Sequence, residues 1–247
     1  MPTISYQLYT SRNWPLADTL DMLERVGFEA VDGFGPLFED PAATRALLDA
    51  HEMTMPTAHF AFDLVAGDPA KVLDIARTLG VQTVIVPFLA PDARPNDKAG
   101  WEAFAARLAE AGKPIRDAGL GYGWHNHDFE FKPNADGSLG IEAIAAHPEV
   151  GFELDLGWIY VAGHNPADWI RKYADRLLAV HIKDRAAEGE NADEDGWADL
   201  GYGAVDYMRI MPALGETEVP VWVLEHDKPS DHERFASRSF NALSMFV

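Results

Sequence analysis

Two histidines and two carboxylates follow a short apolar run in the stretch GYGWHNHDFEF, which covers residues 121–131. The chain holds nine histidines and no cysteine, so imidazole and carboxylate groups are its candidates for metal binding and proton transfer. Three later apolar runs, in FELDLGW, VHIKD and VLEHD, also end in such side chains. The resulting candidate metal ligands are His125, Asp155, His181 and Glu225.

The spacing of these four residues indicates that they lie at the ends of successive strands. They are 30, 26 and 44 residues apart, and one strand-helix unit of a parallel barrel takes about 31 residues. Because neighbouring strands lie about 4.8 Å apart, side chains at their carboxyl ends can converge on one point. Two imidazoles and two carboxylates suit a divalent metal ion; we expect Mn²⁺, with Co²⁺, Fe²⁺, Zn²⁺ or Mg²⁺ as alternatives. Each residue alone could instead be structural, for example as a loop cap.

Other polar and aromatic side chains cluster near the same strand ends. His127 has the strand parity of His125 and is expected to face inward, and Lys183 lies just beyond His181. Both are candidate acid/base groups, beside Glu225 as the candidate base. Glu130 is expected at the mouth of the site or holding a loop. The candidate substrate contacts are His59, Glu130, Trp158 and Arg185, of which the tryptophan could instead be core packing.

Eight short runs rich in Val, Ile and aromatic residues alternate with amphipathic segments, which predicts a parallel α/β fold. Several helical segments begin at Asp or Asn beside Pro and stop at Gly, as from Asp68 to Gly80. We therefore predict one (β/α)8 TIM barrel over residues 1–247. An open doubly wound sheet would give the same alternation, but no glycine-rich phosphate-binding motif follows the first run. The predicted strands are Ile4–Tyr9, Ala30–Phe34, Met55–Phe60, Val81–Phe88, Gly121–His127, Val150–Leu156, Leu177–Asp184 and Val219–Asp227.

Charge and hydropathy narrow the class of partner. Forty acidic and 20 basic residues give a formal net charge of −20, which disfavours nucleic acid as a partner. The acidic segment from Asp184 to Tyr207 is too long for a simple connection and is expected on the active-site face. No secretory leader or long apolar run is evident, so we expect a cytoplasmic protein without membrane contact that acts on a small molecule, with homo-oligomers left open.

Six stretches, in order, resemble the xylose isomerase-like barrels known as sugar phosphate isomerases/epimerases. They are ISYQLYTSR, GWHNHDFEF, FELDLGWIYVAG, VHIKDR, GYGAVDY and VLEHD, and they cover most of the chain. The resemblance implies a divalent metal held by strands five to eight and removal of a proton next to a carbonyl. Asp155, His181 and Glu225 match metal ligands of the family. His125 stands where sugar epimerases of the family carry Glu, which removes one of two facing carboxylate bases.

These observations support several functions. The first is a metal-dependent isomerase or epimerase of a keto-sugar or cyclitol, in which Glu225 removes a proton and His127 or Lys183 returns it. With His125 replacing a carboxylate, β-elimination by a lyase such as a dehydratase is an alternative. A sugar-binding barrel without catalysis is another alternative. An endonuclease IV-like phosphodiesterase is disfavoured by the acidic charge.

Overall fold

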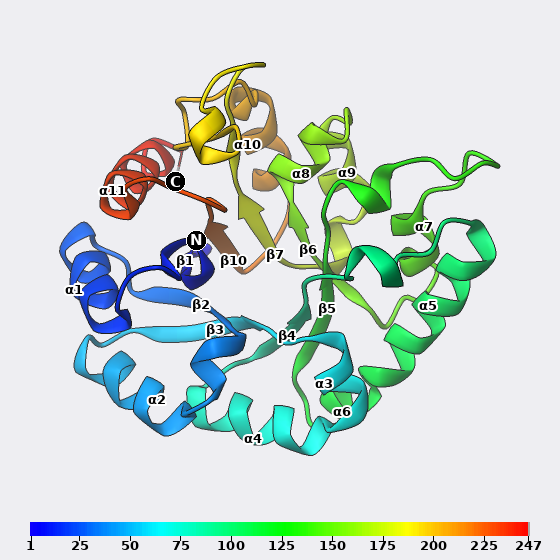
Figure 1. Cartoon of the computed structure of the whole chain (residues 1–247), viewed down its shortest axis with the longest axis horizontal. Coiled ribbons are helices and arrows are strands. Elements are labelled where there is room, and N and C mark those ends of the chain that lie inside the picture. The colour runs from blue at the N-terminus through cyan, green and yellow to red at the C-terminus, as the bar shows by residue number, and fades with distance from the viewer. Residues whose placement is uncertain (247) are drawn as a thin grey trace.

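Eight parallel strands close into a barrel in the computed structural model, which describes residues 1–246. Their order around the barrel is β1-β10-β7-β6-β5-β4-β3-β2 (Figure 1). All eight predicted strands are present, and the TIM barrel is confirmed. The open sheet is wrong, because β1 pairs with both β2 and β10. The strands are β1 Thr3–Gln7, β2 Ala30–Phe34, β3 Thr54–His59, β4 Thr83–Val86, β5 Gly121–His125, β6 Gly151–Asp155, β7 Leu177–Ile182 and β10 Val221–Leu224.

Helices surround the barrel, and each barrel strand is followed by at least one of them (Figure 1). Helix α4 begins as predicted, with the Asp68 carboxylate accepting from the Lys71 N–H, and ends at Gly80 with φ of 78°. None of the helices within residues 1–246 is long and apolar enough to cross a bilayer. The helices are α1 Leu16–Val26, α2 Pro41–Ala50, α3 Phe62–Gly67, α4 Pro69–Leu79, α5 Lys98–Ala111, α6 Lys113–Asp117, α7 Gly140–Ala145, α8 Leu156–Val161, α9 Pro166–Lys172, α10 Tyr207–Gly215 and α11 His232–Leu243.

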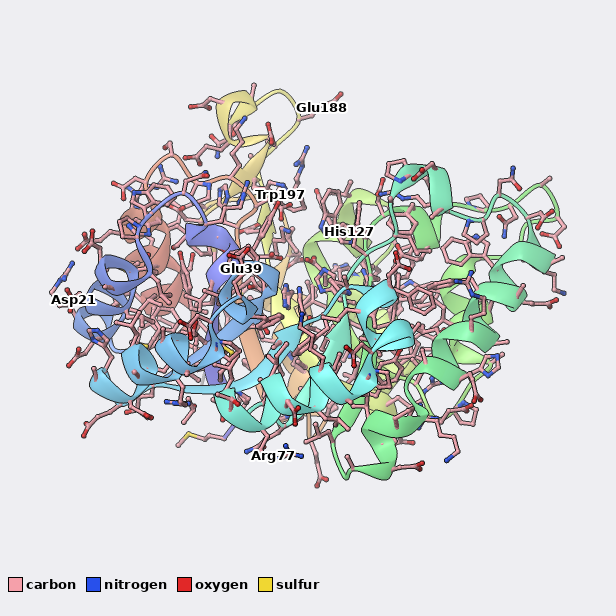
Figure 2. All side chains as sticks on the ribbon, turned by 60° about the horizontal axis from the view of Figure 1, so that its bottom comes forward. Asp21, Glu39, Arg77, His127, Glu188 and Trp197 are labelled. Atoms are coloured by element: carbon pink, nitrogen blue, oxygen red, sulfur yellow. The ribbon has the colours of Figure 1, made fainter. Side chains whose placement is uncertain are left out.

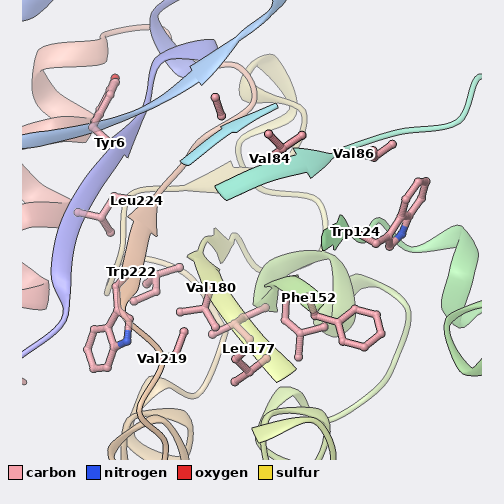
Figure 3. Close-up of a cluster of buried hydrophobic side chains, with 14 of the residues drawn as sticks. Tyr6, Val84, Val86, Trp124, Phe152, Leu177, Val180, Val219, Trp222 and Leu224 are labelled. Atoms are coloured by element: carbon pink, nitrogen blue, oxygen red, sulfur yellow. The ribbon is translucent and has the colours of Figure 1, made fainter. Parts of the chain in front are cut away.

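The two faces of the strands have different compositions. Side chains such as Trp124, Phe152 and Val180 are fully buried in the apolar core (Figure 3). On the other face of β7 and β10, Ala179, Val221 and Val223 form a small separate apolar cluster. Toward the carboxyl ends the same face carries buried carboxylates and imidazoles. Burying polar groups is unfavourable unless they find partners, so these buried side chains indicate that the functional site lies in this part of the barrel.

The acidic segment after β7 is an ordered excursion rather than a simple loop. It contains an antiparallel pair of short strands, β8 Asp184–Arg185 and β9 Trp197–Ala198, and a 3-10 turn, η6 Ala192–Glu194, between them (Figure 1). Arg234 in α11 holds the segment, because its guanidinium donates to both carboxylate oxygens of Glu194, at 2.9 and 3.0 Å, and to Asp199. The segment is thereby fixed beside the carboxyl ends of the strands.

Candidate metal centre and active site

The four candidate metal ligands lie together at the carboxyl ends of β5, β6, β7 and β10. One donor atom from each of His125, Asp155, His181 and Glu225 lies within 4.8 Å of the other three, and all four residues are buried. His181 Nδ1 is 2.8 Å from a Glu225 oxygen, and Asp155 Oδ2 is 3.9 Å from both His125 Nε2 and His181 Nδ1. Four residues spread over 100 positions thus form one cluster because four adjacent strands end there.

The donor atoms fit a divalent metal ion. Asp155 Oδ1 accepts from the Trp158 N–H at the start of α8, whereas the buried Asp155 Oδ2 has no hydrogen-bond partner within residues 1–246. Burial raises the pKa of Asp155 to about 7, and a cation beside Oδ2 would remove that penalty. Burial and the neighbouring His181 lower the pKa of His125 to about 3, so its imidazole is neutral and keeps a lone pair for a metal. His/Asp/Glu donors suit Mn²⁺, Fe²⁺, Co²⁺ or Zn²⁺.

A third carboxylate, Glu153, lies beside the two candidate histidine ligands. Its Oε2 atom is 3.2 Å from His125 Nδ1, 3.1 Å from His181 Nε2 and 2.5 Å from His59 Nε2. Each of the first two rings therefore turns one nitrogen to Glu153 and the other to the candidate metal position. Carboxylates that accept the outer N–H of a metal-bound imidazole orient the ring and increase its basicity.

The polar network extends across the barrel to β1 and β2. Asp32 Oδ2 is 3.4 Å from both His59 Nε2 and His181 Nε2, and it accepts a hydrogen bond of 2.8 Å from Gln7 Nε2. Burial opposes a charge on His181, but Glu153 and Glu225 outweigh it and raise the pKa of His181 well above its ordinary value. The carboxylates beside this imidazole thus favour its protonated form.

Lys183 is a buried cation between three carboxylates. Its ammonium is 2.8 Å from Asp227, 3.0 Å from Glu225 and 3.6 Å from Asp155. Burial lowers the pKa of Lys183, but Asp227 and Glu225 outweigh it and raise the pKa above its ordinary value. For Glu225, burial alone would raise the pKa. The positive charges of Lys183 and His181 outweigh burial and hold the pKa of Glu225 well below its usual range. At neutral pH Lys183 is charged and Glu225 is ionised.

A cavity of about 960 Å³ opens over this cluster, and five of the residues predicted for the site line it: His59, His125, His127, Trp158 and Glu225. The His127 Nδ1 atom is buried without a hydrogen-bond partner among the described residues. Burial and His125 lower its pKa well below the ordinary value, so the imidazole is neutral. The rings of His127, Trp158 and Trp197 form a row with 5.2 and 4.7 Å between successive centroids (His127 and Trp197 are labelled in Figure 2).

Two predicted substrate contacts lie outside the cavity lining. Glu130 is fully buried, and its two oxygens accept from Trp124 Nε1 and from the His127 N–H, at 2.8 and 2.9 Å. These two hydrogen bonds hold the loop after β5, and substrate contact by Glu130 stays a prediction. Arg185 belongs to β8, which has left the barrel, and its guanidinium donates to the Asp195 carbonyl over the Trp197 ring.

Glu153, Asp32 and Asp227 are candidate functional residues that the sequence analysis missed. Glu153 lies two residues before Asp155, so strand alternation alone places both on the inner face of β6. Asp32 is the single charged residue in the otherwise apolar strand β2. Asp227 has the parity of Glu225, at the end of the last strand. In each case the sequence showed a carboxylate at a strand position whose side-chain alternation places it on the inner face of the barrel.

The closed parallel barrel with a His/Asp/Glu cluster at the ends of four adjacent strands defines the class: a TIM barrel with a candidate metal centre. The chain belongs to the family of xylose isomerase-like TIM barrels, whose model matches residues 20–241.

The chain also resembles individual proteins at low sequence identity. An inosose dehydratase from Clostridium beijerinckii is 26% identical over 136 residues, which is 50% of this chain and 46% of that enzyme. A solved sugar phosphate isomerase/epimerase from Parabacteroides distasonis has a TM-score of 0.82 at 20% identity, covering 99% of this chain and 94% of its own. The IolI protein, solved with a bound zinc atom, has a TM-score of 0.74 at 16% identity, covering 99% and 96%. At these identities the two structures support the fold alone.

Proposed function

We propose that the protein is a divalent-metal-dependent isomerase or epimerase that removes a proton next to the carbonyl of a keto-sugar or cyclitol. One observation carries the proposal: four donor atoms from four adjacent strands lie within 4.8 Å of one another, and one of them, Asp155 Oδ2, is buried without a hydrogen-bond partner within residues 1–246. His125, Asp155, His181 and Glu225 would hold the metal, with Mn²⁺ first and Fe²⁺, Co²⁺, Zn²⁺ or Mg²⁺ as alternatives.

The chain supplies the groups for proton transfer. A divalent cation, when bound, would polarise the substrate carbonyl and so acidify the adjacent C–H group. Glu225 lines the cavity as an ionised carboxylate and is the base that takes this proton. Neutral His127, with an unpartnered ring nitrogen on the same cavity, can accept and return a proton between neighbouring substrate atoms. Charged Lys183, 3.0 Å from Glu225, donates a hydrogen bond that stabilises the carboxylate and can supply a proton.

A dehydratase is the second candidate, and His125 is the observation that favours it. Epimerisation with two carboxylate bases needs a second carboxylate facing Glu225, and an imidazole occupies that ligand position here. One base combined with a proton donor such as Lys183 suits β-elimination, in which the C–H proton goes to Glu225 and the leaving hydroxyl receives a proton. One distant relative is named as an inosose dehydratase.

The first test is metal content. The protein, purified without chelators or metal-affinity steps, is analysed by mass spectrometry for Mn, Fe, Co and Zn beside His125→Ala and Glu225→Ala. His147→Ala is the control, since this residue lies at the start of the segment before β6, outside the cavity lining. We expect near-stoichiometric metal in the wild type and the control and strong losses in the two site variants. Wild type that stays metal-free after reconstitution with Mn²⁺ would show the proposal to be wrong.

Reaction type is tested separately. Keto-sugars and inososes are incubated in D₂O with the metal-loaded protein, and exchange of the C–H next to the carbonyl is followed by NMR. Exchange with a rearranged or inverted product indicates an isomerase or epimerase. Exchange with loss of water indicates the dehydratase.

A further inference from the structure

The cavity has two unlike sides. One carries the candidate metal centre and Asp227. The other carries five phenylalanines. Phe104 belongs to α5, and the four that follow barrel strands are here called the aromatic wall: Phe34, Phe62, Phe88 and Phe129. They come from the carboxyl ends of β2, β3, β4 and β5, which are consecutive around the barrel, so the wall follows one half of the mouth. The aromatic wall therefore lies on the half of the mouth formed by β2 to β5, where Asp63, Arg94, Arg107 and Asp128 also line the cavity.

Phe88 is the most exposed member of the wall. It follows β4, packs edge-on against His127 and Phe129 at 5.3 and 6.4 Å between centroids, and still has 44% of its surface exposed. The Arg94 guanidinium lies 3.8 Å from the Phe129 centroid and 5.1 Å from that of Phe88, and Arg94 Nε donates to the Leu89 carbonyl. These contacts hold the wall in place while leaving apolar surface open to the cavity, which a ligand can cover.

The cavity is larger than one small sugar needs. Pockets for drug-sized ligands span about 300–1,000 Å³, and this cavity, at about 960 Å³, is at the upper end. A single keto-sugar or cyclitol ring on the metal centre would leave space bounded by the aromatic wall. Hydroxyl groups placed directly against the exposed ring of Phe88 would lose water without gaining a polar partner from that ring, whereas a flat apolar ring would bury the phenylalanine surface.

We propose that the substrate is a keto-sugar glycoside, with the sugar ring at the metal centre and an aromatic aglycone against Phe88 and its neighbours in the aromatic wall. This inference rests on the proposed function for the sugar end. A phosphate in place of the aglycone fits less well. Three arginines line the cavity. Arg12 donates to the Tyr9 and Asp227 carbonyls, Arg94 donates to the Leu89 carbonyl, and the Arg107 guanidinium lies 5.1 Å from the centroid of the Phe62 ring. The carboxylates of Asp63 and Asp128 line the same cavity and would repel a phosphate.

Binding of non-reacting analogues tests the inference without requiring turnover. The dissociation constants of phenyl α- and β-D-glucopyranoside are measured by calorimetry against the two methyl glucosides and glucose 6-phosphate. For the metal-loaded wild type we expect at least one phenyl glucoside to bind about tenfold more tightly than its methyl counterpart. Phe88→Ala should reduce this ratio to near one while leaving the methyl glucoside and metal content unchanged. Tyr202→Ala, which removes an aromatic ring that is 63% exposed and outside the cavity lining, is the matched control and should keep the ratio.

Three outcomes would overturn the inference: equal affinity for phenyl and methyl glucosides, tightest binding of glucose 6-phosphate, or a ratio unaffected by Phe88→Ala. Metal content of the same preparation separates this failure from failure of the proposed function. A protein that holds metal but shows no phenyl preference disproves the aromatic subsite and leaves the metal-dependent chemistry standing. A protein without metal contradicts the proposed function whatever the glucosides do.

Discussion

Glu153 Oε2 lies 3.2 Å from His125 Nδ1, while Nε2 of the same ring lies 3.9 Å from Asp155 Oδ2. The imidazole thus stands between one carboxylate that can hold its N–H and another that shares the candidate metal position. His181 repeats the arrangement with its nitrogens exchanged, Nε2 toward Glu153 and Nδ1 toward Glu225. One carboxylate therefore contacts both candidate histidine ligands and can set the orientation of their rings.

Glu153→Gln should weaken metal binding without unfolding the barrel. The amide keeps the volume of the side chain but loses the charge that holds the outer N–H groups of the two ligand rings. Loss of such a partner costs about 10–100-fold in metal affinity. The measurement is the dissociation constant for Mn²⁺ and Zn²⁺ by competition with a chromophoric chelator.

The control for this variant is Glu149→Gln, which changes a surface glutamate whose side chain is 40% exposed. Circular dichroism checks that both variants are folded. Equal metal affinity in wild type and folded Glu153→Gln would mean that Glu153 does not position the ligands.

Lys183→Met should destabilise the metal-free protein strongly and the metal-loaded protein less. The substitution keeps a long side chain but leaves the buried Glu225 and the half-buried Asp227 without their cation, and breaking a buried ion pair such as Lys183–Glu225 costs about 3–5 kcal/mol. A divalent metal beside Glu225 would replace part of the lost positive charge. Urea unfolding with and without Mn²⁺ measures the difference. Lys113→Met, which removes an exposed pair with Asp117, should cost under about 1 kcal/mol, and a Lys183 effect of that size would contradict the prediction.

Glu194 should make stability fall in acid. Burial alone would raise its pKa, but hydrogen bonds from Ser230 and Arg234 outweigh burial and lower the pKa to about 2. Because the folded pKa lies below the unfolded value, the stabilisation is present above about pH 4.5 and is lost as pH falls toward 2, with an upper size of about 3 kcal/mol. Glu194→Gln should be less stable at pH 7 and lose less stability between pH 5 and pH 2.5. Parallel curves for the two proteins would show that Glu194 does not couple folding to pH.

The positions of the strands were predictable from the sequence to within three residues at each end, whereas hydrogen-bond partners were not. The regular spacing of His125, Asp155 and His181 reflects the strand-helix repeat of the fold. Because the strands that carry them are adjacent, residues at this spacing lie close together. Glu153 was visible by its parity with Asp155 but had no role until the structure placed three imidazoles around it. Arg185 lies outside the cavity lining because the chain leaves the barrel after Ile182 and forms a separate antiparallel pair, which strand periodicity does not predict.

Glu130→Gln separates a structural role from substrate contact at the loop after β5. Both oxygens of Glu130 accept from buried N–H groups, those of the Trp124 ring and the His127 backbone. Burial raises the pKa of Glu130 to about 8, so at neutral pH little charge is lost on substitution. The NH₂ group of Gln cannot accept, so one buried donor loses its partner at a cost of about 1–3 kcal/mol. We expect lower stability in urea with metal affinity unchanged, since none of the four candidate ligands contacts this side chain through a hydrogen bond or ion pair within residues 1–246. Normal stability combined with weaker binding of keto-sugar analogues would instead return Glu130 to the substrate contacts.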